Sequence, residues 1–205
     1  MIASIDALIG EIRDRADSRA RVLVAVAGAP GSGKSTLAET LVKKLGHSAA
    51  VLPMDGYHLD NPVLERRGLL ERKGAPETFD ADAFVALVRS LRTEPVLTYP
   101  TFDRGADRTV PNAGRIDESS NIVVIEGNYL LLDSPPWTDL GSLFDLTVYL
   151  DVPRKDLEAR LIQRWINHGL SESNARTRAL GNDMRNVDLV TGTSRTADFI
   201  VQMRD

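Results

Sequence analysis

The amino-acid sequence predicts an α/β fold with a mostly parallel five-stranded sheet and helices on both of its faces. Short apolar runs alternate along the chain with longer segments of helical periodicity, and this alternation is typical of βαβ units. The runs are apolar throughout, as expected for strands that are buried on both faces. A chain of 205 residues has the length of one domain, so we expect residues 1–205 to form a single unit. The expected strands are Val22–Ala27, Ala49–Met54, Ile122–Ile125, Leu146–Leu150 and Phe199–Val201.

A helix is expected before the first strand. Isoleucine and leucine recur at helical spacing from Ile2 to Ile12, which predicts an amphipathic helix. Asp6 and Glu11 interrupt its apolar pattern, so the segment differs from the apolar core of a secretory signal. No apolar run in the sequence approaches membrane-spanning length.

Composition narrows the environment and the partners. The sequence contains no cysteine, which excludes disulfides and cysteine zinc sites and is compatible with a reducing cytoplasm. A formal net charge of −4 argues against a nucleic-acid partner, because nucleic-acid-binding domains usually carry a basic face. We therefore expect a cytoplasmic monomer or homodimer whose partner is a small molecule, with no nucleic acid and no membrane.

The first strand runs directly into a glycine-rich motif, GxxxxGK[ST], that begins at Gly28 and ends at Ser35. Its glycines allow backbone N–H groups to turn toward phosphates, Lys34 supplies a positive charge, and the Ser35 hydroxyl can bind Mg²⁺. The motif predicts a P-loop NTPase fold that binds a nucleoside triphosphate with Mg²⁺. The expected nucleotide-binding residues are Gly28, Ala29, Pro30, Gly31, Ser32, Gly33, Lys34, Ser35 and Thr36.

The middle of the chain shows three further features. The helix after the motif should end near Gly46, and a later helix should begin behind a cap at Asp80. Residues 55–78 have no strong period, and a loop of that length in a compact domain is more often functional than idle. We expect residues 95–111 to form extended structure outside the main sheet.

Two carboxylates follow expected strands and should meet at the same sheet edge. Asp55 could orient an acceptor hydroxyl and accept its proton, or it could form a local Asp-Gly turn. His58 could contact substrate or be a solvated loop histidine. Glu126 could hold a water bound to Mg²⁺, or it could cap the turn that starts at Gly127.

The helix after Pro153 carries a row of basic side chains. Arg160, Arg164 and His168 fall on one face, where they could close over transferring phosphates. We therefore expect a helical lid at about residues 153–185, with Gly169 as a possible hinge. The alternative is a solvated surface helix whose arginines pair with Glu158 or Glu172.

Several motifs together resemble one family. They are the phosphate loop, Asp55-Gly-Tyr, the phrase from Asn61 to Asp80, Glu126-Gly127 and Asn186-x-x-Leu-Val190. This set resembles the phosphoribulokinase, uridine kinase and bacterial pantothenate kinase family, most of all its short bacterial members described as fructose transport system kinases. The resemblance implies a kinase in which Lys34 and Ser35 hold Mg-ATP and Asp55 serves the acceptor hydroxyl. It also implies a lid arginine at Arg164 and an adenine-site residue at Asn186.

The acceptor site is less determined. The expected acceptor residues are Asp55, Tyr57, His58, Asp103 and Arg104, and the Phe-Asp-Arg sequence ending at Arg104 replaces the Tyr-Asp-His motif of relatives. This rim is rich in hydrogen-bonding groups and poor in aromatic planes, which favours a sugar-like alcohol over a nucleoside. A nucleoside or pantothenate-like acceptor stays open.

A phosphate loop also occurs in proteins of other functional classes. A P-loop ATPase or nucleotide-dependent switch stays open, although the sequence has neither the Asn-Lys-x-Asp motif of GTPases nor the Leu-Ser-Gly-Gly-Gln motif of transporter ATPases. A non-catalytic nucleotide-binding regulator would leave Asp55 and Arg164 unexplained.

Overall fold

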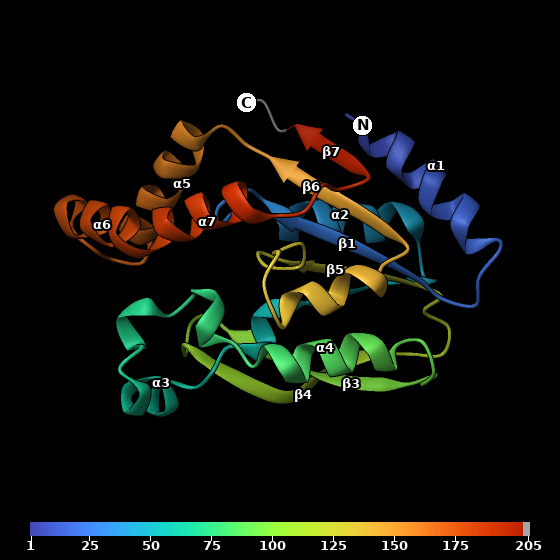
Figure 1. The fold of residues 1–205 in the computed structure, drawn as a ribbon, viewed down its shortest axis with the longest axis horizontal. Coiled ribbons are helices and arrows are strands. Elements are labelled where there is room, and N and C mark those ends of the chain that lie inside the picture. The colour runs from blue at the N-terminus through green and yellow to red at the C-terminus, as the bar shows by residue number, and fades with distance from the viewer. Residues whose placement is uncertain (203–205) are drawn as a thin grey trace.

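The computed structural model describes residues 1–202. A five-stranded parallel sheet forms its centre, in the order β2-β5-β1-β6-β7 (Figure 1). The α/β fold class expected from the apolar runs is confirmed, because all five runs became strands of this one sheet. The strands are β1 (Val22–Gly28), β2 (Ala49–Pro53), β5 (Ile122–Gly127), β6 (Leu146–Asp151) and β7 (Phe199–Gln202).

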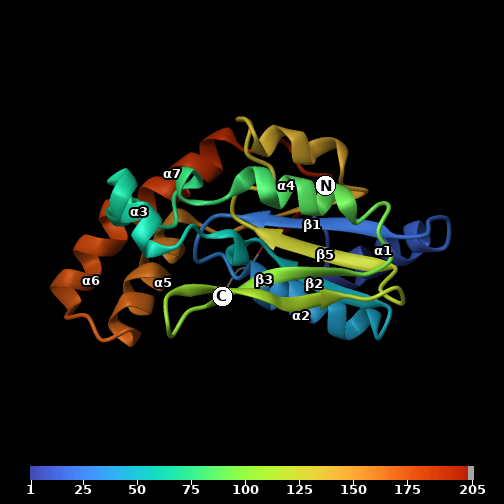
Figure 2. The same cartoon turned by 90° about the horizontal axis from the view of Figure 1, so that it is seen from below.

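Helices cover both faces of the sheet, as the apolar runs require. All seven residues of β1 are buried, and alternate side chains of this strand enter two different hydrophobic clusters. Figure 2 shows α2 on one side of β1 and β5 and α4 on the other. The covering elements include α1 (Ile5–Ala16), α2 (Lys34–Leu45), α4 (Ala81–Ser90) and the 3₁₀ helix η4 (Trp137–Ser142).

Local sequence signals set several helix ends. The Ser4 hydroxyl caps α1 by accepting the Ala7 N–H, and the Asp80 carboxylate caps α4 by accepting the Ala83 N–H. Helix α2 ends at Gly46, whose φ of +90° lies in the region that favours glycine. Among the described residues, no helix combines the length and apolarity needed to cross a membrane.

The segment expected as an aperiodic loop contains a short helix. Within residues 55–78 the chain forms α3 (Asn61–Arg67), and this element contradicts the prediction of a continuous loop. Seven residues make less than two full turns, which is too short to display an apolar period. The rest of this part of the chain includes three 3₁₀ helices, η1 (Met54–Tyr57), η2 (Leu70–Arg72) and η3 (Pro76–Thr78).

A β-hairpin lies outside the main sheet, as expected. Strands β3 (Leu97–Asp103) and β4 (Arg108–Ile116) pair with each other in antiparallel fashion. Its first strand passes so close to η1 that a Cβ added at Gly56 would lie 1.8 Å from the Pro100 carbonyl oxygen. We call β3, β4 and the turn between them the acceptor-side hairpin, because Asp103 and Arg104, which the sequence predicts to face the acceptor, lie at its tip.

The last third of the chain forms a helical layer at one end of the sheet (Figure 1). It consists of α5 (Arg154–Asn167), α6 (Glu172–Arg178), the π-helical turn η5 (Ala179–Asp183) and α7 (Met184–Thr193). Gly169, with a φ of +89°, lies in the connection between α5 and α6. We use the name lid for residues 153–183, the part of the expected lid (about 153–185) that ends with η5; its Leu161 side chain lies so close to the phosphate loop that a Cβ added at Gly31 would approach it to 3.2 Å.

Candidate active site

The phosphate loop connects the end of β1 to the start of α2, at the carboxyl edge of the sheet. Gly31 and Gly33 have φ values of +80° and +94°, which other residues adopt only with strain. A Cβ at Gly28 would approach both the Leu150 carbonyl oxygen and the Ser32 hydroxyl to 2.9 Å. Each of the three glycines is therefore required by backbone conformation or by space.

Lys34 is buried beneath this loop. Its side chain is 7% exposed, and its Nζ donates a 3.0 Å hydrogen bond to the Ala29 carbonyl oxygen. Burial lowers the pKa of Lys34, while the nearby carboxylates of Glu126 and Asp55 act in the opposite direction. A lysine confined to the loop in this way presents its charge where phosphates would lie.

The two residues expected at the metal lie in contact. The Ser35 hydroxyl donates a 3.0 Å hydrogen bond to Oε1 of Glu126, which lies near the end of strand β5. Glu126 is 6% exposed, and burial raises its pKa although Lys34 lowers it. A hydroxyl and a carboxylate are hard oxygen ligands, and Mg²⁺ typically takes few protein ligands beside phosphates and water. The residues present therefore fit Mg²⁺, which Ser35 and Glu126 would hold.

Asp55 lies at the same edge, in η1. Its Oδ2 accepts a 2.8 Å ion-paired hydrogen bond from Arg104 in the acceptor-side hairpin. The Asp55 charge also raises the pKa of Glu126, so both carboxylates belong to one electrostatic environment. The structure thus brings Asp55, Arg104, Lys34 and Glu126 to one end of the sheet.

His58 contacts the backbone of Asp55 and two aromatic rings. Its Nδ1 lies 2.8 Å from the Asp55 carbonyl oxygen, and its ring lies between Phe79 and Phe102, with centroid distances of 4.1 and 4.6 Å. Burial is the main cause that lowers the pKa of His58. The aromatic sandwich differs from the solvated loop histidine that sequence reasoning left open.

Two other expected acceptor residues point elsewhere. Tyr57 packs edge-on against Phe84 at 5.1 Å and is 8% exposed, and burial raises its pKa to about 12. The Asp103 carboxylate accepts the backbone N–H groups of Gly105 and Ala106 and thereby shapes the hairpin turn. The hydrogen bond that the Asp55 carboxylate accepts comes from Arg104, not from either of these side chains.

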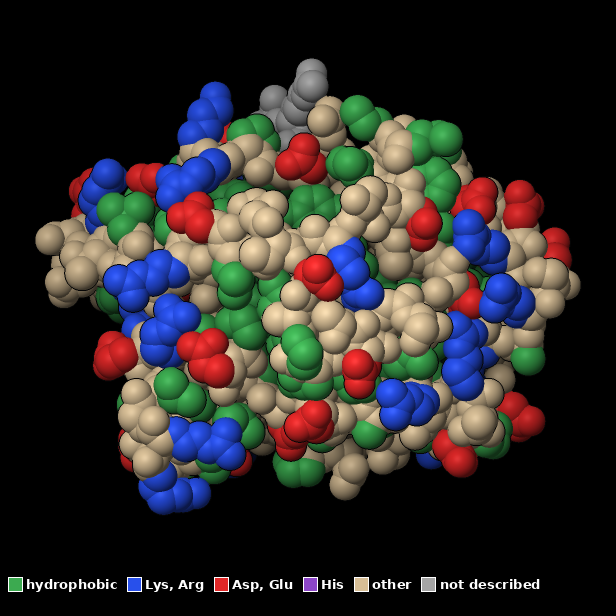
Figure 3. Space-filling view, viewed as in Figure 1, with side chains coloured by type: hydrophobic (Ala, Val, Ile, Leu, Met, Phe, Trp, Pro, Cys, Tyr) green, Lys and Arg blue, Asp and Glu red, His purple; other side chains and the backbone are tan. Residues whose placement is uncertain are grey.

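Arg164 lies in the lid, where its guanidinium is 5.2 Å from the Trp165 ring centroid. Its charge contributes to the lowering of the Lys34 pKa, which links the lid to the phosphate loop electrostatically. Glu158, one of the expected pairing partners, forms ion pairs with Arg154 and Arg176. Basic side chains gather over the lid and around α3 on the left of Figure 3.

Asn186 lies on the buried face of α7 with 2% exposure. Its Oδ1 has no hydrogen-bond partner among the residues that the structure describes. An unpaired buried acceptor is uncommon in folded proteins. Its assignment to the adenine site stays a prediction.

Sequence reasoning missed a set of contacts beside the site. Arg72 and Lys73 join the lid to the acceptor-side hairpin. On the lid side the contact is made by Asn182, which hydrogen-bonds to the Arg72 side chain and to the Lys73 carbonyl oxygen. Arg72 and Lys73 lie within the family-like motif from Asn61 to Asp80, and this motif was the only sequence feature that pointed to them. Asn182 lies in a π-helical turn that sequence periodicity does not indicate.

Comparison with known proteins identifies the family. The sequence model of the Phosphoribulokinase / Uridine kinase family matches residues 23–203. The chain belongs to this family. It is therefore a kinase of the P-loop type, and P-loop kinases use ATP, typically with Mg²⁺.

Relatives within the phosphoribulokinase/uridine kinase family differ in the substrates that their names state. A candidate uridine kinase of Schizosaccharomyces pombe is 36% identical, with 98% of this chain and 91% of that protein covered. A pantothenate kinase of Listeria welshimeri is 30% identical, with 76% of this chain but only 53% of that protein covered. The crystal structure of a candidate fructose transport system kinase from Silicibacter sp. TM1040 has a TM-score of 0.93 at 46% identity, covering 97% of this chain and 98% of that one.

Proposed function

We propose that this kinase transfers the γ-phosphoryl group of Mg-ATP to a hydroxyl group of a small polar metabolite, with a fructose-like sugar as the first candidate. The observation that carries the proposal is the meeting of Asp55 with Lys34 and the Ser35–Glu126 pair at one sheet edge. These groups are the base, the phosphate ligand and the metal ligands that phosphoryl transfer needs.

Each group has one role in this proposal. Asp55 accepts the proton of the acceptor hydroxyl while the hydroxyl oxygen forms a bond to the γ-phosphorus. The bond from that phosphorus to the bridging oxygen breaks, and ADP leaves with the electron pair. Lys34 and Arg164 stabilise negative charge on the phosphates, and the lid keeps water away from the γ-phosphoryl group. Mg²⁺, when bound, neutralises phosphate charge.

The acceptor rim favours a sugar-like alcohol. Asp55 and Arg104 supply charged hydrogen-bonding groups there, with side chains that are 27% and 59% exposed. The nearby rings of Phe79 and Phe102 pack against His58, so they are already occupied as stacking surfaces. The nucleobase of a nucleoside acceptor would therefore find few free aromatic rings on which to stack. The names of the relatives keep a uridine-like nucleoside and a pantothenate-like alcohol as second candidates.

A coupled ADP-release screen tests the proposal directly. The purified protein with Mg-ATP is offered fructose-like sugars, uridine, cytidine and pantothenate-like alcohols, and the Lys34→Ala variant serves as the blank. We expect acceptor-dependent ADP release with at least one sugar. Release of ADP at one rate, whichever acceptor is present, would instead support a P-loop ATPase or switch. We further propose that the protein works in the cytoplasm as a monomer or homodimer.

A further inference from the structure

Two neighbouring residues beside the site reach in opposite directions. Arg72 and Lys73 lie at the end of η2, between α3 and α4 in the sequence. The Arg72 side chain reaches the lid, whereas the Lys73 side chain reaches the turn of the acceptor-side hairpin. In Figure 1 the lid lies directly above this part of the chain.

The contact with the lid is made by several polar groups. Nη1 of Arg72 donates a 2.8 Å hydrogen bond to Oδ1 of Asn182, and Nδ2 of Asn182 donates a 2.9 Å hydrogen bond back to the Lys73 carbonyl oxygen. Asn182 is only 6% exposed, so both bonds are shielded from water. Arg178 adds an ion pair to Glu71 at 3.3 Å. The next lid residue, Asp183, accepts a 2.6 Å hydrogen bond from Nε1 of Trp165, which fixes the π-helical turn to α5.

The contact with the hairpin is equally dense. Nζ of Lys73 donates to Oδ1 of Asn61 at 2.6 Å, to Oδ1 of Asp107 at 2.8 Å and to the Asp107 carbonyl oxygen at 3.1 Å. Nδ2 of Asn61 donates to the other Asp107 carboxylate oxygen, and Nζ lies 5.1 Å from the Phe102 ring centroid. The Lys73 side chain is 11% exposed, so this cation is bound much more firmly than a surface lysine.

The turn that carries both contacts is itself attached to the core. The Tyr129 hydroxyl, on a fully buried side chain, donates to the Gly74 carbonyl oxygen. The Gly74 N–H in turn donates to the Thr78 hydroxyl at 2.9 Å. A turn held at this many points passes a displacement from one contact to the other instead of absorbing it.

We propose that Arg72 and Lys73 are positioning residues that couple the seating of the lid to the position of Arg104 at Asp55. Asp107, which Lys73 holds, lies three residues after Arg104 in the same hairpin turn. Movement of the lid onto bound nucleotide is therefore transmitted through Arg72, Lys73 and Asp107 to Arg104. Arg104 in turn pairs with Asp55, the proposed base. The inference rests on the proposed roles of the lid and of Asp55.

Hydrogen exchange with Mg-AMPPNP as the probe tests this coupling without an acceptor. In the wild-type protein we expect the probe to slow exchange in residues 172–183 of the lid and, about tenfold, in residues 103–108 of the hairpin, a size usual for coupled sites. Arg72→Met and Lys73→Met should keep the slowing in the lid and lose it in the hairpin. Asn182→Ala removes the contact from the lid side and should also lose the slowing in the hairpin. Lys73→Arg keeps a cation at this position and should retain part of that slowing.

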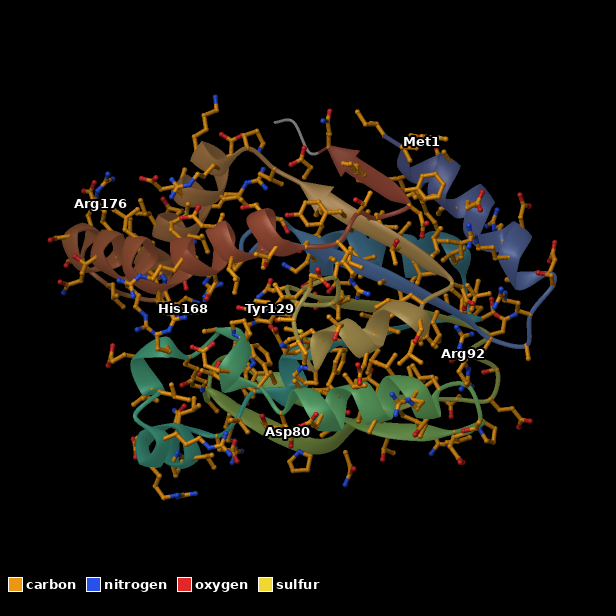
Figure 4. All side chains as sticks on the ribbon, viewed as in Figure 1. Met1, Asp80, Arg92, Tyr129, His168 and Arg176 are labelled. Atoms are coloured by element: carbon orange, nitrogen blue, oxygen red, sulfur yellow. The ribbon has the colours of Figure 1, made fainter. Side chains whose placement is uncertain are left out.

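Two controls make the result decisive. Arg176→Met removes a lid arginine that lies at the outer end of the lid in Figure 4 and should respond like the wild type. The double variant Arg72→Met/Lys73→Met should lose no more hairpin protection than either single variant, because the contacts act in series. Retained hairpin protection in both single variants, or additive losses in the double variant, would overturn the coupling. An unresponsive lid in the wild type would instead count against the proposed nucleotide function.

Discussion

The Ser35 hydroxyl donates a hydrogen bond to the Glu126 carboxylate across 3.0 Å, although the two residues are 91 positions apart in the sequence. Ser35 lies in the first turn of α2, which follows strand β1 and the phosphate loop, and Glu126 lies near the end of strand β5, which pairs with β1. The parallel register of these two strands therefore brings together the two residues that we propose as Mg²⁺ ligands. The charges of Lys34 and Asp55 both act on the Glu126 carboxylate.

Replacement of Lys34 by alanine should abolish phosphoryl transfer while the protein stays folded. The ammonium group is the one cation within the phosphate loop, and neighbouring loop residues offer only backbone N–H groups and hydroxyls. Calorimetry with Mg-ATP measures the binding, and a coupled assay measures turnover. Lys43→Ala, an exposed lysine on the same helix, is the matched control. Unchanged affinity together with unchanged turnover in Lys34→Ala would remove the assignment.

Asp55→Asn should lower kcat by about 10²-fold or more, because the amide keeps the shape but cannot accept the proton. The affinity for Mg-ATP should stay close to that of the wild type. Asp103→Asn should have a much smaller effect, since Asp103 bonds to its own turn. If Glu126→Gln gave the larger kcat loss at saturating Mg²⁺ and Asp55→Asn were near wild type, the roles of the two carboxylates would have to be exchanged.

Arg164→Ala should reduce kcat more than it reduces nucleotide affinity. Negative charge on the transferring group is redistributed during the reaction, and a lid arginine contributes most once the lid is seated. Separate measurements of kcat and of the Mg-ATP dissociation constant distinguish the two effects, and Arg176→Ala provides the comparison. A loss that a lower melting temperature explains completely would return Arg164 to a structural role beside Trp165.

The stability of the protein should depend on the protonation of His58. Burial lowers the pKa of His58 in the folded state, so below about pH 6.5 the unfolded chain binds this proton more readily than the folded protein. The free energy of unfolding should therefore fall as the pH is lowered from about 6.5 through the depressed pKa. Urea titrations between pH 7 and pH 5 should give a weaker pH dependence for His58→Phe. His168→Asn, at an exposed lid position, should follow the wild type.

The acceptor preference should appear in kcat/KM values under identical Mg-ATP. Fixed polar partners such as Asp55 and Arg104 can strongly reject an analogue that lacks a matching hydroxyl, because their own groups would be left unpaired. The kcat/KM values for fructose-like sugars should therefore exceed those for uridine and cytidine. A tenfold preference for the nucleosides would reject the sugar assignment and leave the kinase assignment intact.

Much of this fold could be predicted from the sequence because the signals are local. Strands buried on both faces are apolar along their whole length, and the phosphate-loop glycines stand at fixed intervals. The placement of Ser35 and Glu126 at one edge could be inferred as well, because Ser35 follows the phosphate loop after β1 and Glu126 lies at the end of the neighbouring parallel strand.

The parts that could not be predicted depend on pairings between distant segments. Arg72 and Asn182 are 110 positions apart, and no period or motif relates them. The direction of a side chain could also not be predicted in segments that lack the alternating pattern of a strand. Tyr57 and His58 are adjacent, yet the former packs in the core and the latter faces the hairpin.

The close approach at Gly56 has a consequence for how this enzyme can diversify. A side chain there would collide with the Pro100 carbonyl oxygen, so the root of the hairpin is anchored to the residue that follows Asp55. The turn at residues 104–107 bears Arg104 and is held by side chains instead, because Lys73 and Asn61 donate hydrogen bonds to Asp107. If the proposed roles of Asp55 and Arg104 hold, loop grafting that keeps Asp107 should exchange one acceptor for another while Asp55 stays fixed, so that the hairpin tip would serve as an interchangeable specificity module on a constant phosphoryl-transfer frame.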